Sequence, residues 1–384
     1  MRVLLAHNRY QQAGGEDAVL AEEYRLLQRN GVEVELYEQD NQRINSMPAM
    51  QVAVDTIWSR RTVSEMGAYI QRFRPDIIHV HNTFPLISPS LYFAAAKHGV
   101  PVVQTLHNFR LFCAQAMFMR NGAVCEDCIG RLPWRGVMRR CYRESSAQSA
   151  VVVGMQGIHH MLGTYRNKIT RYIALNNFCR DKFIEAGLPA DRIVIKPNFV
   201  DLPAPIPANR HGGLFVGRLS PEKGIATLAQ ALRLYPEAGI DVIGHGPQEE
   251  ELKGLPAARL LGWMKGEEIY ERMARAAYLV MPSIWYENFP RTLVEAYACG
   301  LPVIASRLGA MAELVRDGET GLLFTPGDAD GLATILRWAD NHPAEMRRMG
   351  DAARREYESH YTSDINFQQL MHIYDEARHY VRAA

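Results

Sequence analysis

The stretch MPSIWYENFPRTLVEAYACGLPVIAS, residues 281–306, is the most informative part of this chain. Apolar runs predict strands at Tyr278–Pro282 and at Pro302–Ala305. The residues between them predict a helix at Arg291–Cys299, because Gly300 is a natural helix stop and the proline after it cannot continue a helix. The stretch therefore predicts a strand–loop–helix–strand unit of an α/β fold.

Two glutamates of this stretch, Glu287 and Glu295, are separated by seven residues. We expect Glu287 in the loop ahead of the helix, near unpaired backbone N–H groups, and Glu295 a little over one turn into the helix. A carboxylate beside such donors suits a hydroxylated or phosphorylated ligand. Two surface glutamates without a function, on an ordinary strand–helix–strand unit, would give the same sequence pattern. The rest of the sequence is needed to distinguish the two alternatives.

The composition is that of a globular protein without a dominant charge. The chain has 384 residues, of which 47% are hydrophobic and 22% charged, and its formal net charge is +1. No global field therefore favours nucleic acid or a membrane, although basic residues gather at 131–143 and 166–171. The opening residues MRVLLAHN predict a first strand and no signal peptide, and no run reaches the ~20 apolar residues of a membrane span. We expect a cytoplasmic protein, with or without peripheral contact to the inner face of a membrane.

Strand and helix patterns alternate through the first half of the chain. The predicted strands are Arg2–Ala6, Glu33–Tyr37, Asp76–His81, Val102–Leu106, Ala150–Met155, Ile173–Leu175 and Ile193–Lys196. The predicted helices include Asp17–Gln28, Val63–Phe73 and Ser90–Lys97. Alternation of this kind predicts parallel βαβ units.

A second α/β series follows a proline-rich stretch, LPAPIPANRH at residues 202–211, which predicts a stiff linker. The strands predicted after it, besides the two already described, are Gly213–Val216, Ile240–Ile243 and Ala258–Leu261. The predicted helices are Gly224–Leu234, Glu267–Arg275, Ala329–Asn341, Pro343–Tyr357 and Asp364–Val381.

These patterns predict two doubly wound α/β domains. We place the first at residues 1–200, a linker at 201–211, the second at 212–362 and a last helix within 363–384. Open α/β sheets bind ligands at the carboxyl ends of their strands, and two such domains facing each other would form a cleft there. Functional residues are therefore expected in the loops that follow strands.

Loops after strands of the first half hold glycines and histidines. Gly14 and Gly15 precede a predicted helix, where the backbone can approach a phosphate closely, although an ordinary loop fits the same pair. His107 directly follows a predicted buried strand. The spacing of His79 and His81 could bind a metal, but no third ligand is apparent nearby, and we interpret them as structural or acceptor-side residues.

The sequence GRLSPEKG, residues 217–224, follows the first strand of the second half. Its Arg218 and Lys223 combine a planar guanidinium fork with an ammonium point charge, which suits a diphosphate. A solvated charged loop is the plain alternative. Gly246 and Gly262, in the loops after the next two strands, would let the backbone approach a nucleotide.

In order, the motifs GG, TLHN, GRLSPEKG, IGHGP, LGW and the paired glutamates with EAYACGLPVIAS resemble the retaining nucleotide-sugar glycosyltransferases. More narrowly they resemble family 4, which has the GT-B architecture of two Rossmann-like domains facing across a cleft. The later sequence GAMAELVRDGETGLLFTPGDADGLA is also typical of that family. The resemblance implies that residues 1–200 form the acceptor side, that 212–362 bind the nucleotide sugar, and that the helix within 363–384 crosses back to the first domain.

The resemblance implies a role for each matching residue. Arg218 and Lys223 would bind the donor diphosphate and balance the charge of the leaving nucleotide. Glu287 and His107 would complete the catalytic group at the sugar, and Glu295 would hold the ribose hydroxyls. The other donor-binding residues implied in this way are Gly14, Gly15, Gly246, Gly262, Asn288, Phe289 and Pro290.

The resemblance also implies the reaction, a hexosyl transfer from a GDP- or UDP-sugar to a hydroxyl of a glycan or lipid-linked acceptor in bacterial surface glycan synthesis. Arg218 and Lys223 would stabilise the negative charge that develops on the leaving oxygen. A single carboxylate at the sugar is no double-displacement pair, so retention implies front-face attack, with the departing phosphate accepting the proton of the acceptor. No Asp-x-Asp metal motif stands out, and we expect metal-independent transfer that needs no cofactor. Nothing points to nucleic acid.

Two other functions fit parts of the pattern. A nucleotide-sugar 2-epimerase would share the fold but use no acceptor, and its motifs match less well. A non-enzymatic, two-lobed sugar-binding protein would require an export signal, and a buried cation pair would serve it poorly.

An insert at residues 108–145 of the first domain holds four of the six cysteines. These are Cys113, Cys125, Cys128 and Cys141, and a hairpin turn is predicted among them at Asn121-Gly122. The set contains one Cys-x-x-Cys pair and fits a structural zinc site, while reduced packed thiols fit equally well and a disulfide or redox role is a third reading. The basic, aromatic run 131–143 fits an anionic lipid or a lipid-diphosphate acceptor as well as it fits a solvated surface.

Overall fold

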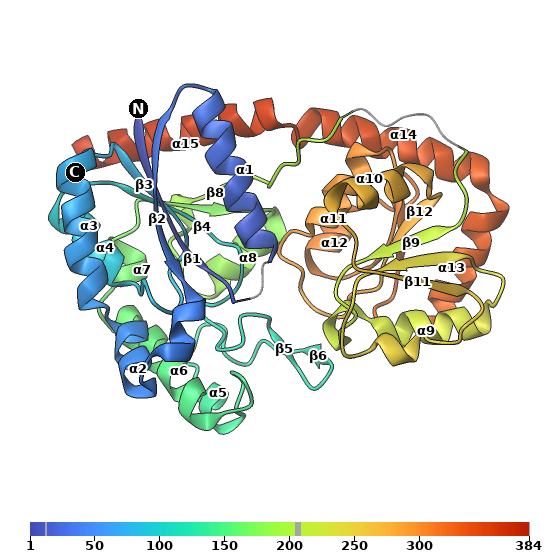
Figure 1. Ribbon diagram of the computed structural model, residues 1–384, viewed down its shortest axis with the longest axis horizontal. Helices are drawn as coiled ribbons and strands as arrows, with labels where there is room; N and C mark the ends of the chain where they lie inside the picture. The colour runs from blue at the N-terminus through green and yellow to red at the C-terminus, as the bar shows by residue number, and fades with distance from the viewer. Residues whose placement is uncertain (12–13, 204–208, 384) are drawn as a thin grey trace. The chain divides into compact units, whose positions relative to one another are not determined.

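The computed structural model describes residues 1–11, 14–203 and 209–383. The chain divides into two compact units (Figure 1). The first comprises Met1–Phe118, Glu126–Asn198 and the chain from Asn366 onward, and the second comprises Met119–Cys125 and Phe199–Ile365. The predicted linker at 201–211 includes residues 204–208, which lie outside the described residues.

Within the described residues, the first unit contains a six-stranded parallel sheet of order β2-β1-β3-β4-β7-β8. Its strands are β1 (Arg2–Arg9), β2 (Glu33–Asp40), β3 (Ile77–Asn82), β4 (Val102–Thr105), β7 (Arg171–Ala174) and β8 (Ile193–Ile195). The direction of winding reverses between β1 and β3, and doubly wound sheets bind ligands at such a switch point.

Helices cover both faces of this sheet. The helices of this unit are α1 (Gly15–Arg29), α2 (Ala49–Ile57), α3 (Arg60–Phe73), α4 (Ser90–Lys97), α5 (Arg135–Met138), α6 (Ser146–Met161), α7 (Thr164–Asn167), α8 (Asn177–Glu185) and α15 (Ser363–Ala383), with 3-10 turns η1 (Asn41–Ser46) and η2 (Ala190–Arg192). Leu20 and Leu27 of α1 share one buried cluster with Val3 of β1 and with Leu370 and Tyr374 of α15. The helices α1 and α15 therefore pack on the same sheet (Figure 1).

The strand predicted at Ala150–Met155 is wrong, because these residues lie inside the helix α6. The run AVVVGM is apolar and β-branched, which favours a strand locally. Ser145 nevertheless caps the helix by accepting a hydrogen bond from the backbone N–H of Gln148. Val152 and Met155, three residues apart and therefore on one helix face, are both buried.

The second unit repeats the plan, and its described residues form a six-stranded parallel sheet of order β11-β10-β9-β12-β13-β14. Its strands are β9 (Gly213–Val216), β10 (Ile240–Ile243), β11 (Ala258–Gly262), β12 (Tyr278–Met281), β13 (Val303–Ser306) and β14 (Gly321–Phe324). Its helices are α9 (Ile225–Leu234), α10 (Gly266–Arg275), α11 (Arg291–Ala298), α12 (Gly309–Leu314), α13 (Ala329–Asn341) and α14 (Pro343–His360), with η3 (Pro221–Lys223) and η4 (Glu249–Glu251). The winding reverses between β9 and β12, so the loops after these two strands flank the switch point.

The predicted turn at Asn121-Gly122 is confirmed. It joins β5 (Met119–Arg120) and β6 (Ala123–Val124), which pair antiparallel. Asn121 has a φ of 51° and Gly122 a φ of 73°, as a two-residue hairpin turn of type I′ requires.

Throughout the described ranges, the helices lack the combination of length and apolar character that crossing a bilayer demands.

Candidate functional site

Backbone hydrogen bonds join the loops that follow β9 and β10 in the second unit. The N–H of Leu219 donates to the carbonyl of His245 at 3.0 Å, and the N–H of Gln248 donates to the carbonyl of Leu219 at 2.8 Å. A Cβ on Gly246 would lie only 2.3 Å from the carbonyl oxygen of Leu219. Glycine is therefore required at 246 by the fold itself, because the two loop backbones approach too closely for a side chain.

The loop after β9 presents the two predicted cations in different ways. Arg218 is exposed, and within the described residues it has no ion-pair partner. Lys223 ends the 3-10 turn η3, and Gly224 follows with a φ of 72°. The N–H of Ile284, from the loop after β12, donates to the carbonyl of Glu222 at 3.0 Å. The two loops at the switch point are thus held together.

The loop after β12 carries Glu287 to Lys223. The Lys223 ammonium lies 2.6 Å from Oε1 of Glu287, and the hydroxyl of Ser283 donates to the same oxygen at 2.8 Å. Glu287 is only 5% exposed. The ammonium also lies 5.6 Å from the ring centroid of Trp285, and Trp285 Nε1 is a buried donor without a described partner. Two of the four predicted catalytic residues therefore meet directly, and a carboxylate, an ammonium and an unused N–H lie close together at these loops.

The residues after Glu287 lead into the helix α11. Asn288, Phe289 and Pro290 are all buried, and Pro290 is the residue immediately before the first helical residue. The first backbone N–H groups of α11 have no partner within the helix, so a ligand at this loop would find donors there. Glu295, one turn further on, accepts from the guanidinium Nε of Arg291 at 2.7 Å. This i,i+4 pair holds the predicted ribose carboxylate in one place.

Gly262 is the last residue of β11, before the third of the loops predicted to bind the nucleotide. It has a φ of 71°, and a Cβ there would lie 3.4 Å from the ring of His245. The N–H of Trp263 donates to Nε2 of that same ring at 3.2 Å, and the Trp263 side chain is 71% exposed. The sequence motifs assign this tryptophan no role, yet an exposed indole beside a predicted nucleotide loop is a surface on which a base could stack.

Gly14 and Gly15 lie at the start of α1 in the first unit. The N–H of Gly14 donates to the carboxylate of Asp17 at 2.8 Å, and Asp17 also lies 2.8 Å from Nε2 of buried His7. Burial alone would raise the pKa of Asp17, but the hydrogen bonds from His7 and Gly14 hold it below its usual value. A Cβ on Gly15 would meet nothing within 4 Å. The fold does not require glycine at 15, which leaves room for a ligand at this helix start.

His107 follows β4 and stacks on His81 of β3. The two ring centroids are 5.2 Å apart, and His107 Nε2 lies 2.9 Å from His81 Nδ1. Burial and the neighbouring His81 lower the pKa of His107 well below its usual value. Burial likewise lowers the pKa of His81 to about 4. Both rings are therefore neutral at physiological pH.

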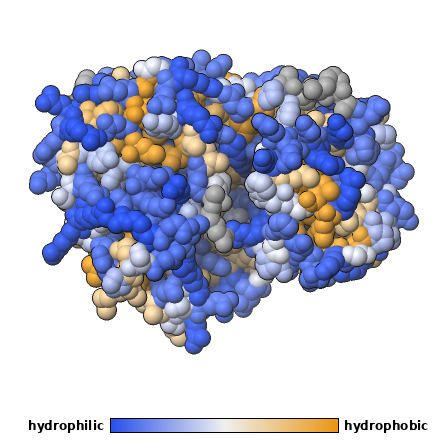
Figure 2. Space-filling model, in the orientation of Figure 1, coloured by the Kyte–Doolittle hydropathy of each residue, from blue (hydrophilic) through white to orange (hydrophobic). Residues whose placement is uncertain are grey.

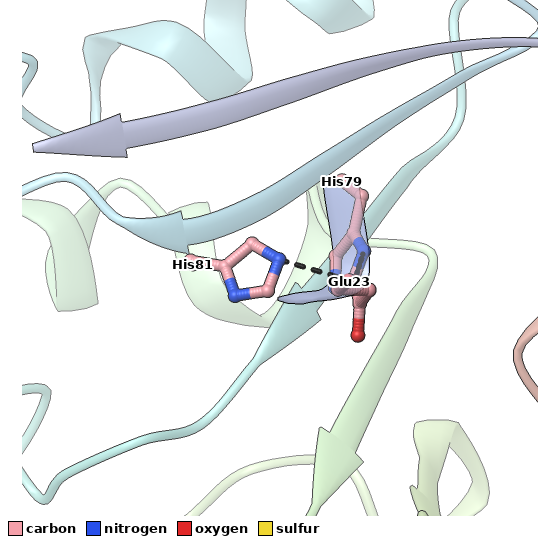
Figure 3. Close-up of side chains that lie close together, drawn as sticks. All are labelled: Glu23, His79 and His81. Carbon is pink, nitrogen blue, oxygen red and sulfur yellow. Dashed lines mark hydrogen bonds and ion pairs between the residues drawn. The ribbon is translucent and has the colours of Figure 1, made fainter. Parts of the chain in front are cut away.

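A buried carboxylate that no sequence motif singles out, Glu23, lies between the two strand histidines. Figure 3 shows His79 and His81, both from β3, directed at the Glu23 carboxylate from α1. Oε1 of Glu23 is 2.9 Å from His79 Nδ1 and 3.2 Å from His81 Nε2. Glu23 is thus a third potential metal ligand beside His79 and His81. It was not apparent from the sequence because it lies on a helix more than fifty positions earlier in the chain.

Glu23, His79 and His81 form a buried group of three potential metal ligands. The Lys196 ammonium, which is also buried, lies 3.3 Å from Oε2 of Glu23. Both nitrogens of His79 are already used, Nδ1 by Tyr374 at 2.7 Å and Nε2 by Thr105 at 2.8 Å. A cation would have to displace these partners and sit beside an ammonium, so we interpret the cluster as a hydrogen-bonded network.

The four cysteines of the insert, Cys113, Cys125, Cys128 and Cys141, are all half-buried. The one Asp-x-Asp in the sequence is Asp328-Ala329-Asp330. Asp328 is the N-cap of α13, accepting a hydrogen bond from the N–H of Gly331 at 2.9 Å. Its carboxylate has a local structural role.

Both units are Rossmann-like, and the switch-point loops of the second bring a lysine and a carboxylate together, which fits a protein that binds nucleotides. Two family models match the chain, Glycosyltransferase Family 4 at residues 13–203 and Glycosyl transferases group 1 at residues 205–356. The chain belongs to this family: it is a group 1, family 4 glycosyltransferase with the GT-B fold.

Individual relatives agree with this assignment. Glycogen synthase of Mycobacterium tuberculosis is 29% identical over 310 residues, which cover 78% of this chain and 67% of that protein. Phosphatidyl-myo-inositol mannosyltransferase of Mycolicibacterium smegmatis is 32% identical over 252 residues, which cover 61% of this chain and 64% of that protein. The crystal structure of Anabaena Alr3699/HepE in complex with UDP has a TM-score of 0.66 at 19% identity, covering 97% of this chain and 99% of that one.

Proposed function

We propose that this enzyme transfers a hexosyl group, with retention, from a nucleoside-diphosphate sugar to a hydroxyl acceptor. The observation that carries the proposal is the contact between Lys223 and Glu287 at the switch point of the second unit, with exposed Arg218 on the same loop as Lys223. A cation is needed where the diphosphate leaves, and a carboxylate is needed where sugar hydroxyls bind. The loops after β9 and β12 bring both together.

The proposed chemistry follows from charge development. Cleavage of the bond between the sugar and the diphosphate puts negative charge on the leaving oxygen, and Arg218 and Lys223 would stabilise it. Glu287 would bind sugar hydroxyls and, as an anion, would favour positive charge at the sugar. Only one carboxylate is assigned to the sugar, so the acceptor would attack from the face that the phosphate leaves, and that phosphate would take the acceptor's proton.

We propose that catalysis is independent of a metal ion, with Arg218 and Lys223 supplying the positive charge. An arginine without an ion-pair partner in the described chain is available to a diphosphate without first breaking another contact. In the single Asp-x-Asp of the sequence, Asp328 caps a helix.

For the donor we propose a UDP- or GDP-sugar. Gly246, Gly262 and the exposed Trp263 would receive the nucleotide, Glu295 the ribose, and Asn288 to Pro290 the sugar and phosphate through backbone groups. Gly14, Gly15 and His107 would contact the donor from the first unit. The Anabaena protein was crystallised in complex with UDP, which makes uridine the first base to test.

For the acceptor we propose a glycan or lipid-linked hydroxyl, with synthesis of a bacterial surface glycan at the cytoplasmic face of a membrane. Large apolar side chains protrude near the basic run 131–143: Leu132 is 59%, Trp134 55%, Met138 73% and Met161 76% exposed. Figure 2 shows apolar atoms among hydrophilic ones toward the lower end of the first unit. Exposed apolar residues amid arginines suit peripheral binding to anionic lipid.

We further propose that Cys113, Cys125, Cys128 and Cys141 bind one structural zinc ion. Four thiols in one insert, two of them in a Cys-x-x-Cys pair, are the ligand set of such sites. Metal analysis of protein purified without chelator is expected to give about one zinc per chain, and less than about half an equivalent would end this proposal.

The function is tested by incubating the purified enzyme with each candidate sugar nucleotide and a membrane glycolipid extract, and following transfer by mass spectrometry. Arg218→Ala is expected to lower the rate by roughly 100-fold, the loss typical of a single transition-state donor. Arg347→Ala, at an exposed position on α14, is the matched control and is expected to retain full activity. Full transfer by Arg218→Ala would contradict the diphosphate role, and epimerised nucleotide sugar without transfer would favour a 2-epimerase.

A further inference from the structure

A continuous chain of hydrogen bonds runs through the interior of the first unit to His107. It begins at the buried ion pair between Lys196 and Glu23, whose Nζ and Oε2 are 3.3 Å apart. It passes from Oε1 of Glu23 to Nε2 of His81 at 3.2 Å. It ends with Nδ1 of His81 and Nε2 of His107 at 2.9 Å. Glu23 and Lys196 are each 1% exposed, so water does not compete for these contacts.

The far end of the chain is anchored to the last helix. The Lys196 ammonium also donates to Oδ1 of Asn366 at 3.0 Å. The amide of Asn366 in turn donates to the carbonyl of Pro197 at 2.7 Å. Because Lys196 is fixed by two partners, the carboxylate of Glu23 is held in one orientation.

The charge state of Glu23 determines which atom donates and which accepts in each of these hydrogen bonds. Burial alone would raise the pKa of Glu23, but neighbouring His79 and Lys196 more than offset burial and hold that pKa well below its usual value. An ionised carboxylate can only accept, so Nε2 of His81 must carry a hydrogen. His81 is neutral, so its Nδ1 is a bare acceptor, and the hydrogen between the two rings must belong to Nε2 of His107.

The remaining nitrogen of His107 is then determined as well. His107 is neutral with its hydrogen on Nε2, so its Nδ1 carries a lone pair and no hydrogen. Among the described residues, no group forms a hydrogen bond with this Nδ1.

We propose that Glu23 is a positioning residue for glycosyl transfer, which acts through His81 to hold His107 as the tautomer whose bare Nδ1 accepts a hydrogen bond from a hydroxyl of the sugar substrate. This inference rests on the proposed function for its ligand, but the tautomers themselves are a property of the enzyme alone. A carboxylate that fixes a histidine tautomer through its other nitrogen is a general device for orienting an imidazole.

The direct test reads the histidine tautomers in the substrate-free enzyme by long-range proton–nitrogen NMR of the imidazole rings. The wild type is expected to show a protonated Nε2 and a bare Nδ1 for both His81 and His107. A protonated Nδ1 on His107 in the wild type would overturn the proposal outright.

The variant Glu23→Gln/Lys196→Met removes both buried charges at once and keeps the side-chain sizes, so it leaves no unpaired charge that could prevent folding. A glutamine amide can donate as well as accept, so His81 and His107 are expected to populate both tautomers. Transfer is expected to fall roughly 10- to 100-fold in kcat, with unchanged binding of nucleoside diphosphate. Unaltered tautomers in this variant would overturn the proposal even if its activity fell.

Tyr374→Phe is the matched control. Its hydroxyl contacts His79 in the same buried cluster, at 2.7 Å, but lies outside the chain from Glu23 to His107. The control is expected to leave the tautomers of His81 and His107 and the kcat unchanged. An equal fall of kcat in Tyr374→Phe and in Glu23→Gln/Lys196→Met would mean that the cluster serves folding only. Absence of transfer by the wild type would instead contradict the proposed function, with the tautomers still readable in the free enzyme.

Discussion

The ammonium of Lys223 lies 2.6 Å from Oε1 of Glu287, although the two residues belong to different loops of the second unit. Both loops flank the point where the winding of the sheet reverses. Lys223 is proposed to face the leaving diphosphate and Glu287 the sugar. Their contact holds each side chain beside the group that we propose it would bind next to.

A double-mutant cycle with Lys223→Met and Glu287→Gln tests this relationship. The partners' side chains are 26% and 7% exposed, so the pair is only partly screened by water, and we expect a coupling of about 1 kcal/mol in the free energy of unfolding. Each single variant is expected to lower transfer by roughly 100-fold. Denaturant unfolding and initial rates measure the two effects.

The exposed pair of Lys253 and Glu250 supplies the control cycle, with side chains 68% and 80% exposed. Its coupling should be too small to measure, and its variants should transfer at the wild-type rate. Equal couplings for the two pairs would mean that the Lys223–Glu287 contact is an ordinary surface ion pair.

Gly246→Ala tests the close approach of the loops after β9 and β10. The new Cβ would lie 2.3 Å from the carbonyl oxygen of Leu219, so the loops must separate, and we expect about 2 kcal/mol of destabilisation together with weaker nucleotide binding. Gly266→Ala is the control, because a Cβ at that position, the first of α10, meets nothing within 4 Å. Thermal unfolding with and without UDP or GDP measures both properties. A fully stable Gly246→Ala protein would refute the steric argument.

The buried histidines predict a loss of stability in mild acid. Burial lowers the pKa of His81 from 6.5 to about 4, so between these values the unfolded chain binds a proton that the folded protein refuses. The contribution is fully present above pH 6.5 and is lost as the pH falls toward 4, at no more than about 1.4 kcal/mol per pH unit. His107, with its pKa also lowered, acts in the same direction.

Unfolding free energies at several pH values between 4 and 6.5 test this prediction. His81→Gln is expected to flatten the pH dependence, whereas His160→Gln, at an exposed position on α6, is expected to leave it unchanged. A wild-type stability that does not vary across this range would contradict the burial of a neutral imidazole.

Local sequence patterns predicted most elements of the second unit. The strand at Gly213–Val216 and the helix at Ala329–Asn341 have the predicted bounds, because apolar periodicity and flanking glycine or capping residues mark their ends clearly. The prediction failed at Ala150–Met155, where β-branched residues suggested a strand and a longer amphipathic pattern made a helix. Tertiary packing can override the local secondary-structure preference of individual residues.

The candidate site could be predicted where its residues lie in loops directly after strands. Arg218, Lys223 and Glu287 were singled out because parallel strands bring such loops to one edge of a sheet, and the structure places all three in loops after β9 and β12. Glu23 could not be found, since it lies inside a helix pattern and its partners on β3 are brought to it only by tertiary packing. A charged residue on the buried stripe of α1, between Leu20 and Leu27, was the one available signal.

Ligand-dependent thermal unfolding tests most directly whether the second unit binds a nucleoside diphosphate through Arg218 and Lys223. We predict that UDP or GDP at about 100 times its dissociation constant stabilises the wild type by roughly 2.7 kcal/mol, and that the matching monophosphate stabilises it less. Arg218→Ala should lose most of this effect, and Arg347→Ala should keep it. Failure of every nucleoside diphosphate to stabilise the wild type, or equal stabilisation of wild type and Arg218→Ala, would contradict the account.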